Sequence, residues 1–220
     1  MQRIGWVVMV WLMLVVGCGN PPVAVPTVTP IPSSEPTVSV ADAVTFVIEP
    51  SGSTAVYRGE ELFLTGGIDF GDARTEGETA VIEGQFQLVL SQLPQLVGGE
   101  ISVDLRTLVS GNEIRDRAIR QRWLESDKFP FARFVLQDVA AFPTSWQAGE
   151  EVQFLLLGEM TIREVTQPIT FEVAATLADD QLSGVATSFL LMEDYGFEAP
   201  FLPGIVQVTD GVQLTVQFVA

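Results

Sequence analysis

The sequence predicts an all-β domain of about eight antiparallel strands. From residue 43 onward, apolar and polar residues alternate in one segment after another, as in strands with one face in water and one in a core. Glycines and turn pairs such as Asp210-Gly211 separate these segments at spacings that suit hairpins. A polar face on each strand indicates antiparallel pairing, because parallel sheets are usually buried on both faces.

The alternation is clearest in four segments, which are residues 79–90, 98–105, 167–173 and 211–219. In the second segment, Ile101 and Val103 fall on one face, with Glu100, Ser102 and Asp104 on the other. Strands of this kind can close into a barrel without unpaired edges, and its interior is filled by side chains or holds one small ligand. A sandwich of two sheets satisfies the same alternation, so the period alone leaves both architectures open.

One stretch departs from the two-residue period and predicts a short amphipathic helix over residues 112–125. Apolar residues recur there every three or four positions, with Ile114 on one stripe. Asn112 is a good N-cap, and Glu113 lies at the positive end of the helix dipole. Pro130 follows shortly after the stretch, where it favours the end of a helix.

The charge of the chain argues against several classes of function. Acidic residues outnumber basic ones by 28 to 11, and the formal net charge of −17 argues against binding to nucleic acid. Seven of the 11 basic residues fall between residues 106 and 133, where their aliphatic parts can cover apolar surface.

The chain contains no histidine, which excludes Ser-His-Asp and Cys-His catalytic sites and removes the commonest metal ligand. We therefore expect neither an enzyme nor a metal site, although a site built from carboxylates alone remains conceivable.

The first residues have the pattern of an export signal. Arg3 precedes an apolar stretch that is too short to span a bilayer comfortably, and small residues follow it. The sequence Val15-Val16-Gly17-Cys18 resembles a bacterial lipobox, in which the chain is cut before a cysteine that then carries a lipid. On this interpretation residues 1–17 are a lipoprotein signal peptide, and cleavage changes the net charge to −18, since −17 − 1 = −18. The alternative is a plain signal peptide or an anchor helix with a chance cysteine.

Residues 18–42 are expected to form a tether between the lipidated Cys18 and the domain. Six prolines lie between residues 19 and 41, a density that blocks helices and favours an extended chain. A Pro-rich recognition motif is the alternative. The predicted location is therefore outside the cytoplasm, on a membrane-anchored lipoprotein that faces a periplasm or the cell surface.

Three further motifs resemble the YceI-like family in their order and spacing. The first consists of Ser110-Gly111, Arg115-Asp116, Trp123-Leu124, Lys128-Phe129-Pro130 and Phe134, the second of residues 158–162 and 165–168, and the third of Asp194-Tyr195-Gly196-Phe197. Together the motifs extend over about residues 44 to 219.

The resemblance implies a lipocalin-like, eight-stranded antiparallel barrel with a long apolar lumen over residues 43–220. Members of the family are secreted or periplasmic, and some bind polyisoprenoid chains, including quinone-type lipids. Two positions depart from the family pattern. Met192 stands where a basic residue is common, and Arg163-Glu164 replaces a pair such as His-Gly, which puts recognition of a ligand head group in doubt.

The apolar strand faces supply the candidate ligand-binding residues. They are Ile82, Phe86, Ile101, Val103, Phe134, Phe154, Leu156, Ile169, Phe171, Phe189, Leu214 and Phe218. Arg115 and Asp116 are helix neighbours that do not face each other, so each is expected to pair with another element in a structural role. Contact with an anion or a ligand head group is the first alternative, and catalysis is the second. Asp194 is likewise expected to order its loop.

Two functions from different classes remain. The first is a carrier, store or sensor that binds an isoprenoid or another long-chain amphiphile in the lumen, with no cofactor other than this lipid. The second is a ligand-free domain of the cell envelope that serves protein contacts or envelope integrity. The sequence does not indicate the oligomeric state.

Overall fold

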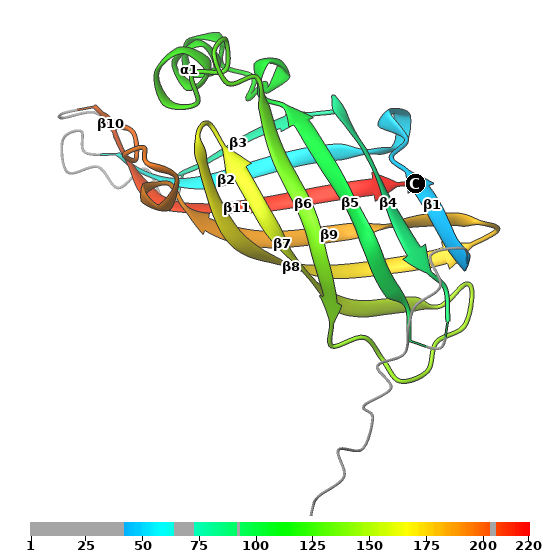
Figure 1. Ribbon diagram of the computed structural model, residues 1–220. Coiled ribbons are helices and arrows are strands. Elements are labelled where there is room, and N and C mark those ends of the chain that lie inside the picture. The colour runs from blue at the N-terminus through cyan, green and yellow to red at the C-terminus, as the bar shows by residue number, and fades with distance from the viewer. Residues whose placement is uncertain (1–41, 64–72, 92, 203–205) are drawn as a thin grey trace, which may run out of the picture. The chain divides into compact units, whose positions relative to one another are not determined.

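The computed structural model describes residues 42–63, 73–91, 93–202 and 206–220 (Figure 1). The predictions for the signal peptide, for Cys18 and for nearly all of the tether lie outside these residues. No helix within the described ranges is long and apolar enough to cross a membrane.

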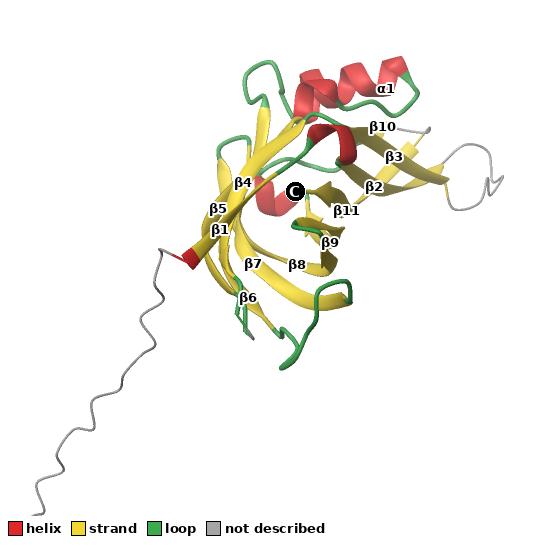
Figure 2. Cartoon of the chain, turned by 90° about the vertical axis from the view of Figure 1, so that its right-hand side faces the viewer, coloured by secondary structure: helices red, strands yellow, loops and turns green. Residues whose placement is uncertain are grey.

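The described residues form one antiparallel sheet, which confirms the predicted all-β class. Its eleven strands within those residues are β1 (Ala43–Val47), β2 (Thr54–Phe63), β3 (Ala73–Thr79), β4 (Ile82–Val89), β5 (Gln95–Asp104), β6 (Phe131–Ala140), β7 (Glu151–Ile162), β8 (Val165–Ala178), β9 (Gln181–Leu191), β10 (Phe201–Leu202) and β11 (Val206–Val219). The hydrogen-bonded order is β1-β4-β5-β6-β7-β8-β9-β11-β2-β3, and β10 pairs with β11. The sheet curls around its apolar face (Figure 2), as in a lipocalin-like fold.

The strand count differs from the predicted eight for a local reason. The 3-10 turn η2 (Pro50–Gly52) divides the first extended segment, so β1 pairs with β4 while β2 pairs with β11 and β3. The chain passes from β4 to β11 at this turn: the Ile48 N–H donates to the Gly84 carbonyl of β4 at 2.9 Å, and the Glu49 N–H donates to the Val219 carbonyl of β11 at 2.8 Å. The short β10 adds a further strand.

Two irregularities in register keep apolar side chains on the inner face. The pairing of β4 with β5 shifts between Gln87 and Leu88, and the pairing of β6 with β7 shifts between Leu136 and Asp138. An extra residue in one strand moves the following side chains to the opposite face. Thus both Leu136 and Val139 reach the interior although three positions separate them.

The predicted helix is present, but it is attached differently from the expectation. It comprises α1 (Glu113–Ala118) and a π-helical turn over residues 119–123, and Asn112 Oδ1 accepts from the N–H groups of Ile114 and Arg115 at 3.1 Å each. The expected apolar stripe was wrong at Ile114, which is 80% exposed, whereas Asp116 is the buried residue of α1. Asp116 accepts hydrogen bonds from Ser110 and Leu124 packs against the core, so the helix is attached through polar as well as apolar contacts.

Candidate functional site: an apolar cavity

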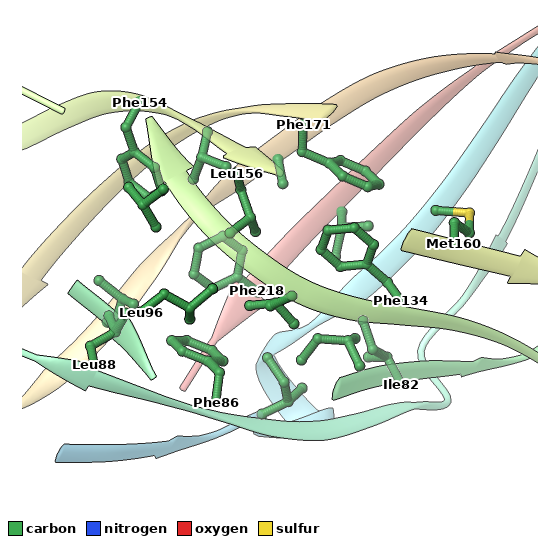
Figure 3. A pocket seen from close by; sticks show the side chains of 18 of the residues that line it. Ile82, Phe86, Leu88, Leu96, Phe134, Phe154, Leu156, Met160, Phe171 and Phe218 are labelled. Carbon is green, nitrogen blue, oxygen red and sulfur yellow. The ribbon is translucent and has the colours of Figure 1, made fainter. Parts of the chain in front are cut away.

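A cavity of about 150 Å³ lies within the curled sheet (Figure 3). Nine of the twelve candidate residues line it: Ile82, Phe86, Ile101, Val103, Phe134, Phe154, Leu156, Phe171 and Phe218. Further lining residues that the sequence reasoning missed include Leu88, Leu96, Leu136, Val139, Phe142, Met160, Val173, Leu182, Ala186 and Val216. Several of these follow a register shift or lie in a loop, where a strict two-residue period gives the wrong face or none.

The other three candidate residues do not line this cavity. Ile169 and Leu214 pack against the core but do not reach the cavity. Phe189 was predicted for the interior, but it is 62% exposed on the outer face, where its ring lies over Gly211. On β9 the buried positions are Ala186 and Leu190, so Phe189 faces outward. Residues 189–191 are all apolar, so the sequence did not show which of them faces inward.

The cavity has a buried end and a half-exposed end. At the buried end, the rings of Phe134 and Phe171 meet edge to face with centroids 5.1 Å apart, and Ile82 is only 1% exposed. At the other end, half-buried Phe142 and Phe154 line the cavity with centroids 5.5 Å apart. Pro94 and Phe142 also line the cavity, so this end of it lies beside the connections β4–β5 and β6–β7.

Close packing on β7 shapes the buried end. The ring of Phe134 lies against Gly158, where a Cβ atom would stand 2.3 Å from the Val135 carbonyl oxygen and 2.5 Å from the ring. Any larger residue at position 158 would have to displace both the backbone of β6 and the ring of Phe134, because no real Cβ contact is that short. This glycine therefore helps to set the width of the cavity.

The cavity offers an apolar guest almost no polar partner. Among the lining residues that the structure describes, Arg133 alone is charged, and its guanidinium donates to Glu100 Oε1 at 2.9 Å on the outer surface. A charged group placed deep in this space would lose its hydration without an opposite charge to replace it. The interior can therefore hold a hydrocarbon group, and any polar head of the same molecule would lie outside it.

Arg115 and Asp116 contact different partners, as the helix geometry predicts. An Arg115 guanidinium nitrogen lies 3.5 Å from Glu61 Oε1, on β2. Asp116 Oδ1 accepts from the N–H of Ser110 at 2.9 Å and from its hydroxyl at 2.5 Å. Asp116 thus joins the helix to the segment that follows β5, away from the residues that line the cavity.

Tyr57 lies close to these charges on the inner side of β2. Its ring fits against Gly77 of β3, and its hydroxyl has no hydrogen-bond partner among the described residues. Burial raises the pKa of Tyr57 to about 12, although the Arg115 cation opposes the rise. The residue is therefore a neutral structural group at physiological pH.

Asp194 lies in the turn η5 (Glu193–Tyr195), with an exposed side chain. Its backbone carbonyl accepts from Gln167 Nε2 at 2.9 Å, while the carboxylate of Asp210 accepts from the Glu193 N–H at 3.1 Å. The turn is ordered by these groups, so the loop-ordering carboxylate expected of Asp194 belongs to Asp210. The described residues contain no group of three or more Cys, Asp or Glu side chains that could hold a metal ion.

Comparison with known proteins assigns this fold to a family. The family model of the YceI-like domain matches residues 46–220. The chain belongs to the YceI-like family.

Two solved structures share the fold of this YceI-like domain at low sequence identity. Burkholderia cenocepacia BcnA has a TM-score of 0.60 and 15% identity, and the match covers 79% of this chain and 99% of BcnA. A polyisoprenoid binding domain from Saccharophagus degradans, implicated in plant cell wall breakdown, has a TM-score of 0.58 and 10% identity over 81% of this chain and 97% of its own. No curated protein sequence matches the chain.

Proposed function

We propose that this protein is a lipid-anchored extracytoplasmic domain that binds the apolar chain of an isoprenoid or another long-chain amphiphile inside its curled sheet. The observation that carries the proposal is the lining of the cavity, which is hydrocarbon on all sides except at Arg133. Membership of the YceI-like family and the similarity to a polyisoprenoid binding domain support the class of ligand. The lipobox at Cys18 supports the anchor, and storage, transport and sensing are all compatible with such a site.

The volume of the cavity limits how the ligand is held. An apolar space of about 150 Å³ stays dry and takes up a molecule the size of benzene, which is comparable to one five-carbon isoprene unit. Burial of the five carbon groups of one isoprene unit contributes about 4 kcal/mol to the free energy of binding, so a single unit would bind only at millimolar concentrations. Tighter binding requires further units, which would lie toward the half-exposed Phe142 and Phe154 and displace side chains there.

Lipid extraction tests this proposal directly. The full chain is purified from a bacterial host, extracted with organic solvent and analysed by mass spectrometry; a polyprenol is then added to the emptied protein. We expect a co-purifying isoprenoid or long-chain amphiphile, or a rise in melting temperature with added polyprenol. An empty protein that also shows no response to polyprenol would overturn the proposal.

The small volume favours one competing function, a ligand-free domain of the cell envelope. The resemblance implied a long lumen, yet side chains already occupy much of the interior. In that case the outer surface would carry the function, and Phe189 would be a candidate contact because it is exposed in a wide hollow of mixed polar and apolar lining that includes Arg58 and Glu172. Replacing Phe189 by Ser would then change envelope phenotypes, while substitutions inside the cavity would act only through stability.

A further inference from the structure

The two connections at the half-exposed end of the cavity form an apolar rim. We define this rim by Leu90, Leu93 and Pro94, between β4 and β5, and by Phe142 and Trp146, between β6 and β7. Leu90 is 37% exposed and Leu93 is 54% exposed, while Pro94 and Phe142 line the cavity. Exposed apolar side chains therefore continue directly from the interior onto the surface, an arrangement that marks interaction sites in soluble proteins.

Trp146 joins the two connections and presents an apolar ring. Its indole Nε1 donates to the Ser91 carbonyl at 2.9 Å, and its ring meets that of Phe142 at right angles with centroids 6.4 Å apart. Because the N–H already has a partner within the protein, the ring can leave water without losing a hydrogen bond. Tryptophan is favoured at the boundary between water and lipid for its combination of an apolar body and one polar group.

The chain enters the fold at this same rim. β1 begins at Ala43, which pairs with Val89 at the end of β4, and Leu90 is the next residue. The first strand of the domain therefore begins beside the rim. The α1 helix lies at the opposite end of β4, β5 and β6 (Figure 1).

We propose that the rim docks on a lipid surface and that the apolar chain of the ligand passes from the bilayer into the cavity without crossing water. This inference rests on the proposed function for the identity of the ligand. A lipid surface fits the rim because the half-exposed end of an apolar cavity, exposed leucines and the first strand of the domain, which follows the tether of the lipid anchor, lie together. A ligand half inserted in the cavity would keep its polar head at the rim. There the docked membrane surface gives the head the same polar environment that it had in the bilayer.

Charge determines which lipid surface fits. Acidic side chains flank the rim, namely Asp138 at the end of β6, Glu150 before β7, and Asp179 and Asp180 in the turn between β8 and β9. The Gly149 N–H donates to the Leu177 carbonyl at 2.8 Å, which places that turn at the same end of the sheet. Anionic lipids would repel these carboxylates, so we infer docking on zwitterionic lipid, weakened as the anionic fraction rises.

The tryptophans of the chain provide the probe. Trp6 and Trp11 lie in the predicted signal peptide, so the lipidated protein that begins at Cys18 retains Trp123 after α1 and Trp146 in the rim. Two single-tryptophan proteins are made by replacing the other tryptophan with Phe, one that retains Trp146 and one that retains Trp123. Each is reconstituted through its lipidated Cys18 in phosphatidylcholine vesicles that carry bromine near the top of the acyl chains, which quenches fluorescence at short range.

We expect the bromolipid to quench Trp146 strongly and Trp123 little. Leu93→Glu in the Trp146 protein should remove most of the quenching, since the lost insertion of one leucine weakens docking about tenfold. Ile114→Glu is the matched control, because Ile114 is also an exposed apolar residue but lies on α1, and it should leave the quenching unchanged. Unchanged melting temperatures would show that the variants fold.

Equal quenching of the two tryptophans, or no effect of Leu93→Glu, would overturn the docking. Quenching of Trp146 that appears only when a second protein is added would also overturn it and would assign the rim to a protein partner. The transfer step is tested by the rate at which the wild-type and Leu93→Glu chains take up polyprenol from vesicles, with an expected slowing of about tenfold. Uptake by the wild-type chain from detergent, without vesicles, tests the proposed function separately, so failure of one inference is distinguishable from failure of the other.

Discussion

Two alanine-to-leucine substitutions separate a true cavity from a filled core. Ala186 on β9 lines the cavity and is 8% exposed, whereas Ala175 on the adjacent β8 is 1% exposed and lies outside the lining. A Cβ atom on the facing Gly184 would lie only 2.9 Å from the Ala175 methyl group, which shows how closely that site is packed. The same chemical change thus meets empty space at one position and tight packing at the other.

The structure predicts opposite changes in the free energy of unfolding for the two variants. Ala186→Leu adds three carbon groups to an apolar space, which contributes up to about 2 kcal/mol to the free energy of unfolding. Ala175→Leu forces three carbon groups into a packed interior, which costs about 1–3 kcal/mol. The difference of about 3 kcal/mol corresponds to roughly 6–12 °C in melting temperature for a domain of this size.

Thermal and denaturant unfolding measure these differences, and polyprenol uptake measures the loss of space. Ala186→Leu should melt at or above the wild type and take up less polyprenol. Ala175→Leu should melt lower, and its polyprenol uptake should be unaffected at temperatures where it remains folded. If Ala186→Leu were as destabilising as Ala175→Leu, or bound polyprenol as well as the wild type does, the reasoning from the cavity would be refuted.

Three other predictions concern the remaining sites. Asp116→Asn should lower the free energy of unfolding by about 1–3 kcal/mol, measured by denaturant titration, because a charged acceptor for both groups of Ser110 becomes neutral; an unchanged midpoint would contradict this role. Burial raises the pKa of Tyr57 and of Tyr195 to about 12 from 10.0, so the unfolded state loses its protons first and stability should fall as the pH rises from 10 to 12. Absorbance titration should find both tyrosines ionising well above pH 10, and a normal titration would contradict the burial. Cys18→Ser should abolish incorporation of labelled fatty acid in a bacterial host, whereas retained label would exclude Cys18 as the anchor.

The basic segment serves mainly to join elements of the structure. Arg106 binds Asp104 with a guanidinium-to-carboxylate distance of 2.6 Å, and this contact holds the pKa of Asp104 below its usual range. Arg120 donates to the Leu108 carbonyl at 3.1 Å, and Arg115 approaches Glu61. In a strongly acidic chain these three arginines neutralise nearby carboxylates and satisfy a backbone carbonyl around α1. Much of the positive charge between residues 106 and 133 therefore joins structural elements to one another.

Local patterns of the sequence were enough for much of the fold. The period-two alternation predicted the all-β class and the inner face of β4 and of the second half of β5, because side-chain direction in a strand depends only on local geometry. Asn112 marked the start of the helix for a similar reason, since an N-cap bonds to the next few N–H groups. The same reasoning failed at Phe189 and Ile114, where the side chain that is buried depends on what packs against the element.

The all-β class, the start of the helix, the family resemblance and nine of the residues that line the interior could be predicted from local patterns. The strand number and order, the register shifts that bring Leu96 and Val139 inside, and the residual volume of about 150 Å³ could not. Neither could the position of the half-exposed lining residues beside the first strand. The physical reason is that alternation is a property of neighbouring residues, whereas the volume and the opening of a cavity depend on how side chains from strands far apart in the sequence fill a shared space.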